Sequence, residues 1–323
     1  MRTRIISDTD LHVSSICLGG GPIGISLGKK DSYRALDFFI DKGGNFIDTA
    51  NVYGKWLIEK RNTSEEMLGK WFVEKGNRSR CILATKGAHP DLSTMHIPRL
   101  SRSDIEMDLE ESLRTLQTDY IDLYWLHRDD ESRPVSDIIE TMNRLVHSGK
   151  IRYFGCSNWK INRIKEAQQY AANNHIKGFV ANQLMWSLAI PNAEGFEDKS
   201  LVTMDDNGMK FHKDTGMTAV AYSSQANGFF SKLEQIGFDH LNDHMKRIYG
   251  SPINLERFNR VKILSKEIGQ SVTTIALAYI MSQTFAGIPI IGYRNVEQLE
   301  ESLKAADVRL DQKAVTYLED GIA

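Results

Sequence analysis

Four titratable side chains, Asp48, Tyr53, Lys86 and His127, lie in or just after short apolar segments of the sequence. A tyrosine has a reference pKa of about 10, but a nearby ammonium group favours the phenolate and makes the phenol a better proton donor. Asp48 would keep Lys86 charged and oriented, and His127 could donate a hydrogen bond to a carbonyl oxygen. Such a set is suited to protonating an oxygen atom while hydride is delivered to carbon.

These residues must be positioned by a regular alternation of short apolar segments with segments of helical spacing. The predicted strands are residues 15–18, 45–50, 81–86, 120–127, 153–158, 178–183, 218–223 and 288–292. The predicted helices are residues 32–42, 64–73, 101–116, a segment ending near 148, 161–172, 204–215, 254–268, 272–283 and 296–305. Ser64 is predicted to cap the second helix, and Ser103 the third, with Glu106 completing a capping box.

Eight strand-plus-helix units without an intervening linker predict a single domain over residues 1–323. Strands that alternate with helices imply parallel pairing through right-handed crossovers, and eight units suggest a closed (β/α)8 TIM barrel of the α/β class. An open doubly wound sheet is the alternative. In a barrel, the strand ends that carry the four polar residues meet at one mouth. A long irregular loop is predicted after the seventh strand.

The composition excludes several classes of protein. The chain of 323 residues has 40 Lys+Arg and 42 Asp+Glu, so it lacks the basic excess that nucleic-acid binding needs. No apolar run is long enough to span a bilayer, and the N-terminal residues lack the apolar segment of a signal peptide. Three widely spaced cysteines form no metal or redox motif. We therefore expect a cytoplasmic protein with no nucleic-acid or membrane partner.

Two further motifs have competing interpretations. The glycines of residues 19–24 spell G-x-G-x-x-G, but Pro22 lacks an N–H and residues 25–30 are not typical of a helix start, so we interpret the match as accidental. His240 and His244 have the spacing of two metal ligands on a helix, but a third ligand is not evident. A solvated helix face is the preferred interpretation, and no metal is predicted.

Residues 46–54 (FIDTANVYG), 84–87 (ATKG), 122–127 (DLYWLH) and 150–158 (KIRYFGCSN) occur in an order and at a spacing that are specific. Through them the chain resembles the aldo-keto reductase family along nearly its whole length. The resemblance implies Tyr53 as proton donor, Lys86 and Asp48 as the residues that tune it, and His127 as the residue that orients the carbonyl. Family members that reduce an alkene carry glutamate at the position of His127, so carbonyl chemistry is favoured.

The resemblance also implies a nicotinamide dinucleotide laid across the barrel mouth, with Gly21 contacting it through backbone alone. The residues expected around the nicotinamide are Ser157, Asn158 and Gln183 at its carboxamide and Tyr222 stacked on its ring. Those expected at the pyrophosphate are Ser223, Gln225 and Gly228. Those expected near the 2′-phosphate and the adenine are Gly292, Tyr293, Arg294, Gln298, Glu301 and Ser302. Because the guanidinium fork of Arg294 suits phosphate, NADPH is favoured over NADH.

Departures from the family pattern affect the substrate pocket and the grip on the cofactor. Trp186 replaces a family tyrosine and could narrow the pocket or stack on a ring substrate, while Gln225 places an amide where the family has an apolar side chain. Residues 55–63 lengthen the loop beyond Tyr53. The aromatic segment 225–252 could fold over the cofactor as a lid or form a static packed flap.

The sequence thus predicts an NADPH-dependent oxidoreductase that interconverts aldehydes or ketones and alcohols by direct hydride transfer, with a tyrosine proton donor. Polar strand ends near Trp56 and Trp186 suggest a small carbonyl or alcohol substrate, sugar-like or polyol-like. One alternative is a regulatory subunit of the same fold that binds the nicotinamide cofactor with little turnover. Another is a metal-dependent barrel isomerase.

Overall fold

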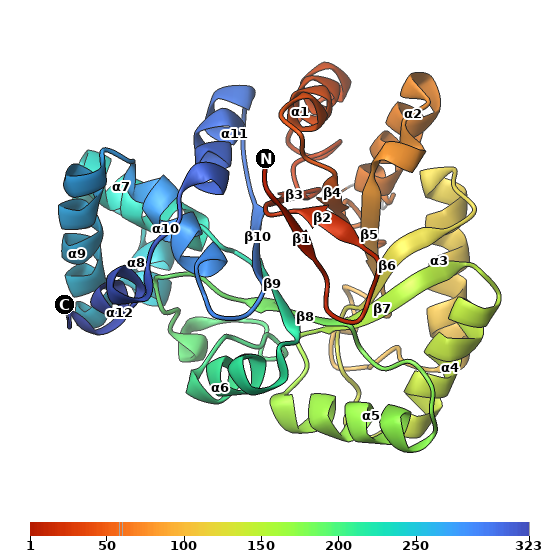
Figure 1. The fold of residues 1–323 in the computed structure, drawn as a ribbon. Helices are drawn as coiled ribbons and strands as arrows, with labels where there is room; N and C mark the ends of the chain where they lie inside the picture. Colours follow the sequence, from red (N-terminus) through yellow and green to blue (C-terminus); the bar gives the residue numbers. More distant parts are fainter. Residues whose placement is uncertain (58, 60, 323) are drawn as a thin grey trace.

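The computed structural model describes residues 1–57, 59 and 61–322. Eight parallel strands form a closed barrel in the order β10-β3-β4-β5-β6-β7-β8-β9, which confirms the predicted (β/α)8 barrel and excludes the open sheet (Figure 1). The barrel strands are β3 (Cys17–Gly19), β4 (Phe46–Asp48), β5 (Ile82–Gly87), β6 (Ile121–Leu126), β7 (Ile151–Ser157), β8 (Ala181–Met185), β9 (Thr218–Tyr222) and β10 (Gly287–Ile291).

Helices surround the barrel. They are α1 (Lys29–Asp41), α2 (Thr63–Lys75), α3 (Arg102–Leu116), α4 (Val135–His147), α5 (Ile161–Asn173), α6 (Asp206–Thr215), α7 (Phe229–Ile236), α8 (Asp243–Tyr249), α9 (Pro252–Ile268), α10 (Val272–Met281), α11 (Val296–Leu303) and α12 (Gln312–Asp320). Most lie next to the strands, while α9 packs on α10 and α12. Among the described residues, no helix has the length and apolar character needed to cross a membrane.

Both predicted helix caps are wrong. Ser64 lies inside α2, where its hydroxyl donates to the Gly20 carbonyl oxygen at 2.8 Å, and Asn62 caps the helix instead. The capping box of α3 begins two residues earlier than predicted: the Ser101 hydroxyl accepts from the Asp104 N–H, and the Asp104 carboxylate accepts from the Ser101 N–H. At α2 a tertiary contact holds the Ser64 hydroxyl, whereas at α3 the cap is set by the local hydrogen bonds between Ser101 and Asp104.

The segment after the seventh barrel strand is not the long irregular loop that the sequence predicted. It contains α7 and α8, joined by short turns. Its aromatic side chains are buried: Phe229 lies 5.7 Å from the Tyr249 ring centre, and Phe230 stacks on Phe258 of α9 at 6.1 Å. These contacts pack the segment against α9, and closure over the cofactor as a lid stays a prediction. Residues 58 and 60 of the lengthened loop beyond Tyr53 lie outside the described residues.

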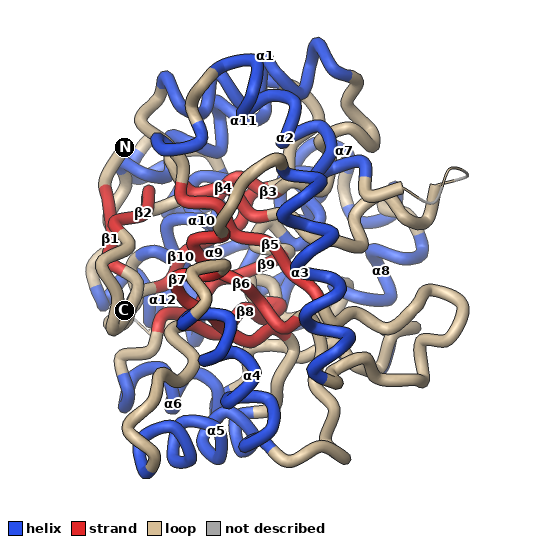
Figure 2. The backbone as a smooth tube through the Cα atoms, turned by 90° about the vertical axis from the view of Figure 1, so that its right-hand side faces the viewer, coloured by secondary structure: helices blue, strands red, loops and turns tan. Residues whose placement is uncertain are grey.

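Two elements were missed by the pattern analysis. A two-stranded antiparallel hairpin, β1 (Thr3–Ile5) and β2 (His12–Ser14), precedes the barrel, and α12 follows the last predicted helix. The hairpin region contributes Ile6, Leu11 and Val13 to a core cluster with inward-facing residues of the barrel strands. It thereby closes the N-terminal end of the barrel, where both chain termini lie, opposite the mouth (Figure 2).

Candidate active site

Lys86 is the centre of a buried polar cluster at the barrel mouth. Its ammonium group donates to the carboxylate of Asp48, to the Thr49 carbonyl oxygen at 2.8 Å and to the Tyr53 hydroxyl at 3.4 Å. Lys86 and Asp48 are 1% and 2% exposed. Burial by itself lowers the pKa of Lys86, but the negative charge of Asp48 and the Tyr53 hydroxyl raise that pKa above its ordinary value. The lysine is therefore charged at neutral pH.

The Asp48 carboxylate is held from a second side. Its Oδ1 accepts hydrogen bonds from the indole Nε1 of Trp125 on β6 and from Nε2 of Gln183 on β8, both at 3.0 Å. With Lys86 on Oδ2, each carboxylate oxygen has a charged or polar donor, as a buried carboxylate requires. Trp125 was missed as a site residue because an indole in an apolar strand is usually core. Trp125 lies two residues before His127, and this spacing does not by itself mark it as a site residue.

His127 follows β6 and faces Tyr53, with ring centres 6.2 Å apart in an edge-on arrangement. Burial lowers the pKa of His127 well below its usual value, and the positive charges of Arg128 and Lys86 act in the same direction. The imidazole is therefore neutral at neutral pH and can donate one hydrogen bond. Its Nδ1 is buried without a hydrogen-bond partner among the described residues.

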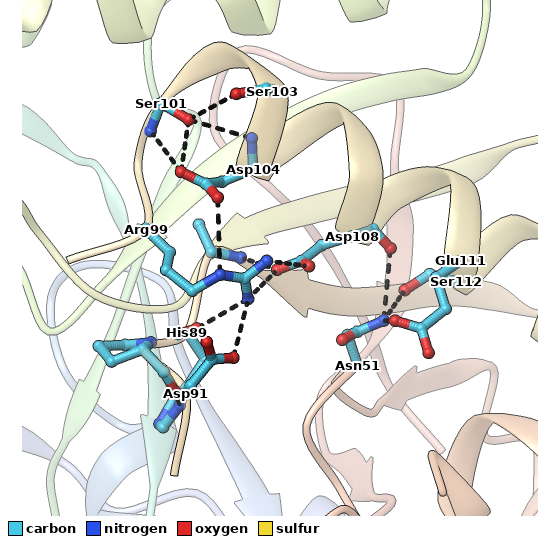
Figure 3. Close-up of polar contacts among 12 residues, drawn as sticks. Asn51, His89, Asp91, Arg99, Ser101, Ser103, Asp104, Asp108, Glu111 and Ser112 are labelled. Atoms are coloured by element: carbon cyan, nitrogen blue, oxygen red, sulfur yellow. Dashed lines mark hydrogen bonds and ion pairs between the residues drawn. The ribbon is translucent and has the colours of Figure 1, made fainter. Parts of the chain in front are cut away.

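A second imidazole, His89, lies edge-on to His127 with ring centres 4.7 Å apart. It belongs to the loop after β5, and burial lowers its pKa to about 4, so it is also neutral. Arg99 holds this loop: it donates to the His89 carbonyl oxygen at 3.1 Å and pairs with the Asp108 carboxylate on α3 at 2.8 Å (Figure 3). The loop wall beside His127 is thus braced by a partly buried ion pair.

Asn158, which follows β7, joins the ends of β6, β7 and β9. Its Oδ1 accepts from the Tyr222 hydroxyl at 2.6 Å and from the Val202 N–H at 3.1 Å. Its Nδ2 donates to the Ser157 hydroxyl at 3.1 Å and to the His127 carbonyl oxygen at 3.4 Å. These bonds fix the position of the Tyr222 ring relative to the His127 segment.

A cavity of about 930 Å³ extends from this cluster along the mouth. It is lined by Asp48 and Tyr53 at one end and by residues of the β9 and β10 loops along its length. The sequence-predicted cofactor residues that line it are Gly21, Tyr222, Ser223, Gln225, Gly228, Gly292, Tyr293, Arg294, Gln298, Glu301 and Ser302. Ser157, Asn158 and Gln183 lie at neighbouring strand ends but do not line this cavity.

The far end of the cavity carries positive charge. Among the described residues, no carboxylate forms an ion pair with Arg294 or with Lys232. Burial lowers the pKa of Lys232, and the positive charge of Arg294 lowers that pKa further. Gln225 spans the two loops: it donates to the Ser302 hydroxyl and accepts from the Gly292 N–H, both at 3.0 Å. A Cβ at Gly21 would meet no atom within 4 Å, so the backbone there borders open space.

These features fit a dinucleotide with its phosphates toward the unpaired cations and its reactive ring toward Tyr53. Lys232 was missed in the sequence because a lysine on a helix is usually solvated, and no pattern marked this one. Trp186 does not meet the expectation of a pocket wall: it is buried against Tyr279 and stacks on Phe285 at 5.7 Å, away from the mouth cavity. Its indole fills the space between β8 and α10.

The two histidines considered for metal binding lie on the flap. In the described part of the chain, no group of three or more His, Cys, Asp or Glu side chains is arranged to hold a metal ion. His240 belongs to a short turn, while His244 lies on α8 and lines the mouth cavity.

A closed barrel with a buried lysine–aspartate pair beside a dinucleotide-sized cavity is consistent with a nicotinamide-dependent oxidoreductase of the barrel type. The model of the Aldo/keto reductase family matches residues 15–322, and the chain belongs to that family. It is therefore an NAD(P)H-dependent oxidoreductase, and small-molecule carbonyl and alcohol substrates fit the family.

Individual relatives agree with this assignment. The chain is 32% identical to the uncharacterized oxidoreductase YrpG of Bacillus subtilis, with 99% of this chain and 95% of the relative covered. It is 28% identical to norsolorinic acid reductase B of Dothistroma septosporum, covering 97% and 82% of the two chains. It is 27% identical to a putative aryl-alcohol dehydrogenase of Saccharomyces cerevisiae, covering 98% and 86%.

A solved structure supports the fold. The crystal structure of a thermostable aldo-keto reductase in complex with the inhibitor epalrestat superposes with a TM-score of 0.70 over 99% of both chains, at 23% identity.

Proposed function

We propose that the protein, acting as one barrel domain over residues 1–323, is an NADPH-dependent reductase of aldehydes or ketones, reversible toward the alcohols. The observation that carries this proposal is the buried chain of contacts from Asp48 through Lys86 to the Tyr53 hydroxyl, 3.4 Å from the ammonium nitrogen. A charged, fixed ammonium beside a phenol at the end of a dinucleotide-sized cavity is an arrangement for proton donation to an oxygen atom.

When bound, a reduced nicotinamide would supply the hydride for the carbonyl carbon. Tyr53 Oη donates its proton to the carbonyl oxygen, and the Lys86 ammonium stabilises the phenolate that remains. Asp48 compensates the lysine charge and fixes its position, while Trp125 fixes Asp48. The neutral imidazole of His127 donates a hydrogen bond to the carbonyl oxygen and orients it toward Tyr53. Ser157, Asn158 and Gln183 are proposed to hold the carboxamide, and Tyr222 the ring face.

We propose a preference for NADPH over NADH because of the cations at the phosphate end of the cavity. Arg294 and Lys232 both line it, and neither takes part in an ion pair among the described residues. A 2′-phosphate would supply the missing negative charge, and the planar guanidinium would bind it through two parallel hydrogen bonds.

For the substrate, we propose an aromatic aldehyde or ketone. Trp56 is 52% exposed, and its ring lies edge-on to Tyr53 with centres 6.1 Å apart. An exposed indole beside the proton donor offers an apolar surface on which a ring can pack. The names of relatives, an aryl-alcohol dehydrogenase among them, point the same way. The polyol-like or sugar-like carbonyl suggested by the sequence stays a prediction and forms the comparison arm of the test.

The test measures consumption of NADPH and NADH by absorbance with a panel of aryl aldehydes and small hydroxyaldehydes. We expect turnover with NADPH, no effect of a chelator, and a lower KM for the aryl substrates. Trp56→Ala is expected to raise KM for the aryl aldehydes alone. Tight NADPH binding without turnover across the panel would instead favour the regulatory subunit, and inactivation by the chelator would favour the metal-dependent isomerase.

A further inference from the structure

A second cavity, of about 800 Å³, lies at the end of the barrel opposite the mouth. It is bordered by the start of the β1–β2 hairpin, by residues 281–286 before β10 and by residues 309–312 before α12. All of these segments lie at the N-terminal ends of barrel strands, whereas the mouth lies at the C-terminal ends. The hairpin side of the molecule faces away from α8 and the mouth loops (Figure 2). The cavity is thus separate from the candidate active site.

Three arginines, Arg2, Arg4 and Arg309, line this cavity. None of them forms an ion pair with a carboxylate in the part of the chain that the structure describes. Burial lowers the pKa of Arg4, and the positive charges of Arg2 and Arg309 lower that pKa further, so the three charges lie within electrostatic reach of one another. The only acidic residue among those lining the cavity, Asp311, uses Oδ1 to cap α12 through the Ala314 N–H at 2.8 Å.

The arginines are only partly satisfied by the protein. Arg2 donates to the carbonyl oxygens of Ala306 and Val308 at 2.6 and 2.8 Å, and Arg4 donates to that of Met281. A guanidinium has five N–H donors, so each retains several for another partner. The side chain of Arg309 has no hydrogen bond to any described residue. Hydrogen bonds to backbone carbonyl oxygens give Arg2 and Arg4 a partial structural role. They give no such role to Arg309.

A buried hydroxyl provides an independent observation. Ser15 lines the same cavity and is 2% exposed, and its Oγ has no hydrogen-bond partner among the described residues. A buried polar atom without a partner costs free energy, and an unpartnered hydroxyl on a residue that lines a cavity calls for an explanation. The hydroxyl can donate to an oxygen of an anion.

We propose that this cavity is a binding site for a small polyanion with two or more phosphate groups, held by Arg2, Arg4 and Arg309 with Ser15 as a further donor. The three like charges repel one another, the single carboxylate of Asp311 among the lining residues offsets them only in part, and a multiply charged anion would remove the remaining cost. Guanidinium forks match phosphate oxygens in shape and charge. The volume exceeds that of a single phosphate and lies in the range of small-molecule sites. The site does not depend on the proposed function.

Isothermal titration calorimetry at constant ionic strength tests the proposal, with pyrophosphate, tripolyphosphate and ATP as probes and sulfate as comparison. The protein is first saturated with NADP⁺, so that the phosphate end of the mouth is filled. A parallel titration uses Arg294→Gln without cofactor, so that a failure of cofactor binding does not obscure the result. We expect one saturable site in both, tighter for the polyphosphates than for sulfate. Equal affinity for tripolyphosphate and ATP would identify the phosphate chain itself as the ligand, and tighter ATP binding an organic phosphate.

Variants locate the site. Because the Arg309 side chain has no contact to lose, Arg309→Gln should fold normally and weaken binding by about tenfold, whereas Arg309→Lys should weaken it less. Ser15→Ala should weaken binding by a few-fold. Arg102→Gln, at an exposed arginine of α3, is the matched control and should leave binding unchanged. Absence of saturable binding, or equal affinities for Arg309→Gln and the wild type or for Arg309→Gln and Arg102→Gln, would overturn the proposal.

Discussion

Charged side chains are paired with each other at one end of the mouth cavity, whereas the cations at the other end have no ion-pair partner among the described residues. At the proposed catalytic end, Lys86 and Asp48 are almost fully buried and neutralise each other within the chain. At the phosphate end, Arg294 is exposed and Lys232 half-buried, and neither is paired with a carboxylate among the described residues. The contrast fits the proposed roles of the two ends: a proton donor would need its charges balanced before the substrate arrives. A phosphate would bring its own charge to the cations that receive it.

The first prediction concerns the residue whose loss should cost most. Tyr53→Phe is expected to lower kcat/KM by about 10³-fold, because the proton donor is removed. Cofactor affinity should not change, since Lys86 keeps its contacts to Asp48 and Thr49. Steady-state kinetics together with fluorescence titration of NADPH measure both. A loss in kcat/KM of less than tenfold would show that Tyr53 is not the donor.

The second prediction tests whether the catalytic end depends on its buried pair for stability. Lys86→Met leaves Asp48 buried without its cation and should lower the free energy of unfolding by about 4 kcal/mol. Adding Asp48→Asn should recover part of that loss without recovering activity. Denaturant unfolding measures the difference, with Arg294→Gln as control, expected to stay within about 0.5 kcal/mol of wild type. Equal stability of Lys86→Met and Arg294→Gln would remove the contrast between the two ends.

The third prediction concerns the buried carboxyl group behind the catalytic strand. Burial raises the pKa of Glu65 from 4.5 to about 7, although Thr85 and Asn62 donate hydrogen bonds to it. Between these two pH values the folded state binds more protons than the unfolded state, so the free energy of unfolding falls as pH rises. The total decrease in the free energy of unfolding should be about 3 kcal/mol, and the decrease should be complete once the pH exceeds about 7.

Glu65→Gln should remove this pH dependence even if its absolute stability is lower, because the amide does not titrate. Unfolding curves of both proteins measured across this pH window give the difference directly. Parallel pH profiles for the two proteins would contradict the prediction.

The fourth prediction tests the phosphate end. Arg294→Gln should weaken NADPH binding by about tenfold, the loss of one charge-assisted contact, and leave NADH binding unchanged. Lys232→Gln should have a smaller effect, since Lys232 also donates to the Asn227 carbonyl oxygen at 3.1 Å. Fluorescence titration with both cofactors measures the ratio. Equal weakening for NADPH and NADH would mean that Arg294 does not contact the 2′-phosphate.

The smallest expected effect is that of Gln225, which joins the two loops at the phosphate end. Gln225→Leu removes its contacts to Ser302 and Gly292 and should weaken both cofactors by about threefold. Gln169→Leu, at an exposed position on α5, is the matched control. Unchanged cofactor affinity in Gln225→Leu would show that the loops hold their positions without this amide.

Local periodicity was sufficient to predict the barrel strands and most of the helices, because the spacing of apolar residues within a segment identifies the face that the segment buries. It failed for the β1–β2 hairpin and α12, which are short and depend on contacts with distant parts of the chain. It also failed for the flap, where the aromatic residues of α7 and α8 were interpreted as a loop. The partner of Phe230, Phe258, lies on the next helix, α9, 28 residues further along the chain, beyond the reach of a local pattern.

By itself, the sequence determined that polar residues end successive strands, and the resemblance of its motifs determined the family. The tertiary structure decided which side chains share those sites. Trp125 and Gln183 hold Asp48, Lys232 lies beside the same cavity as Arg294, and Trp186 packs away from the mouth. The reason is physical: spacing along a strand determines which face a side chain occupies, but only closure of the barrel brings the ends of strands distant in the chain within hydrogen-bonding distance.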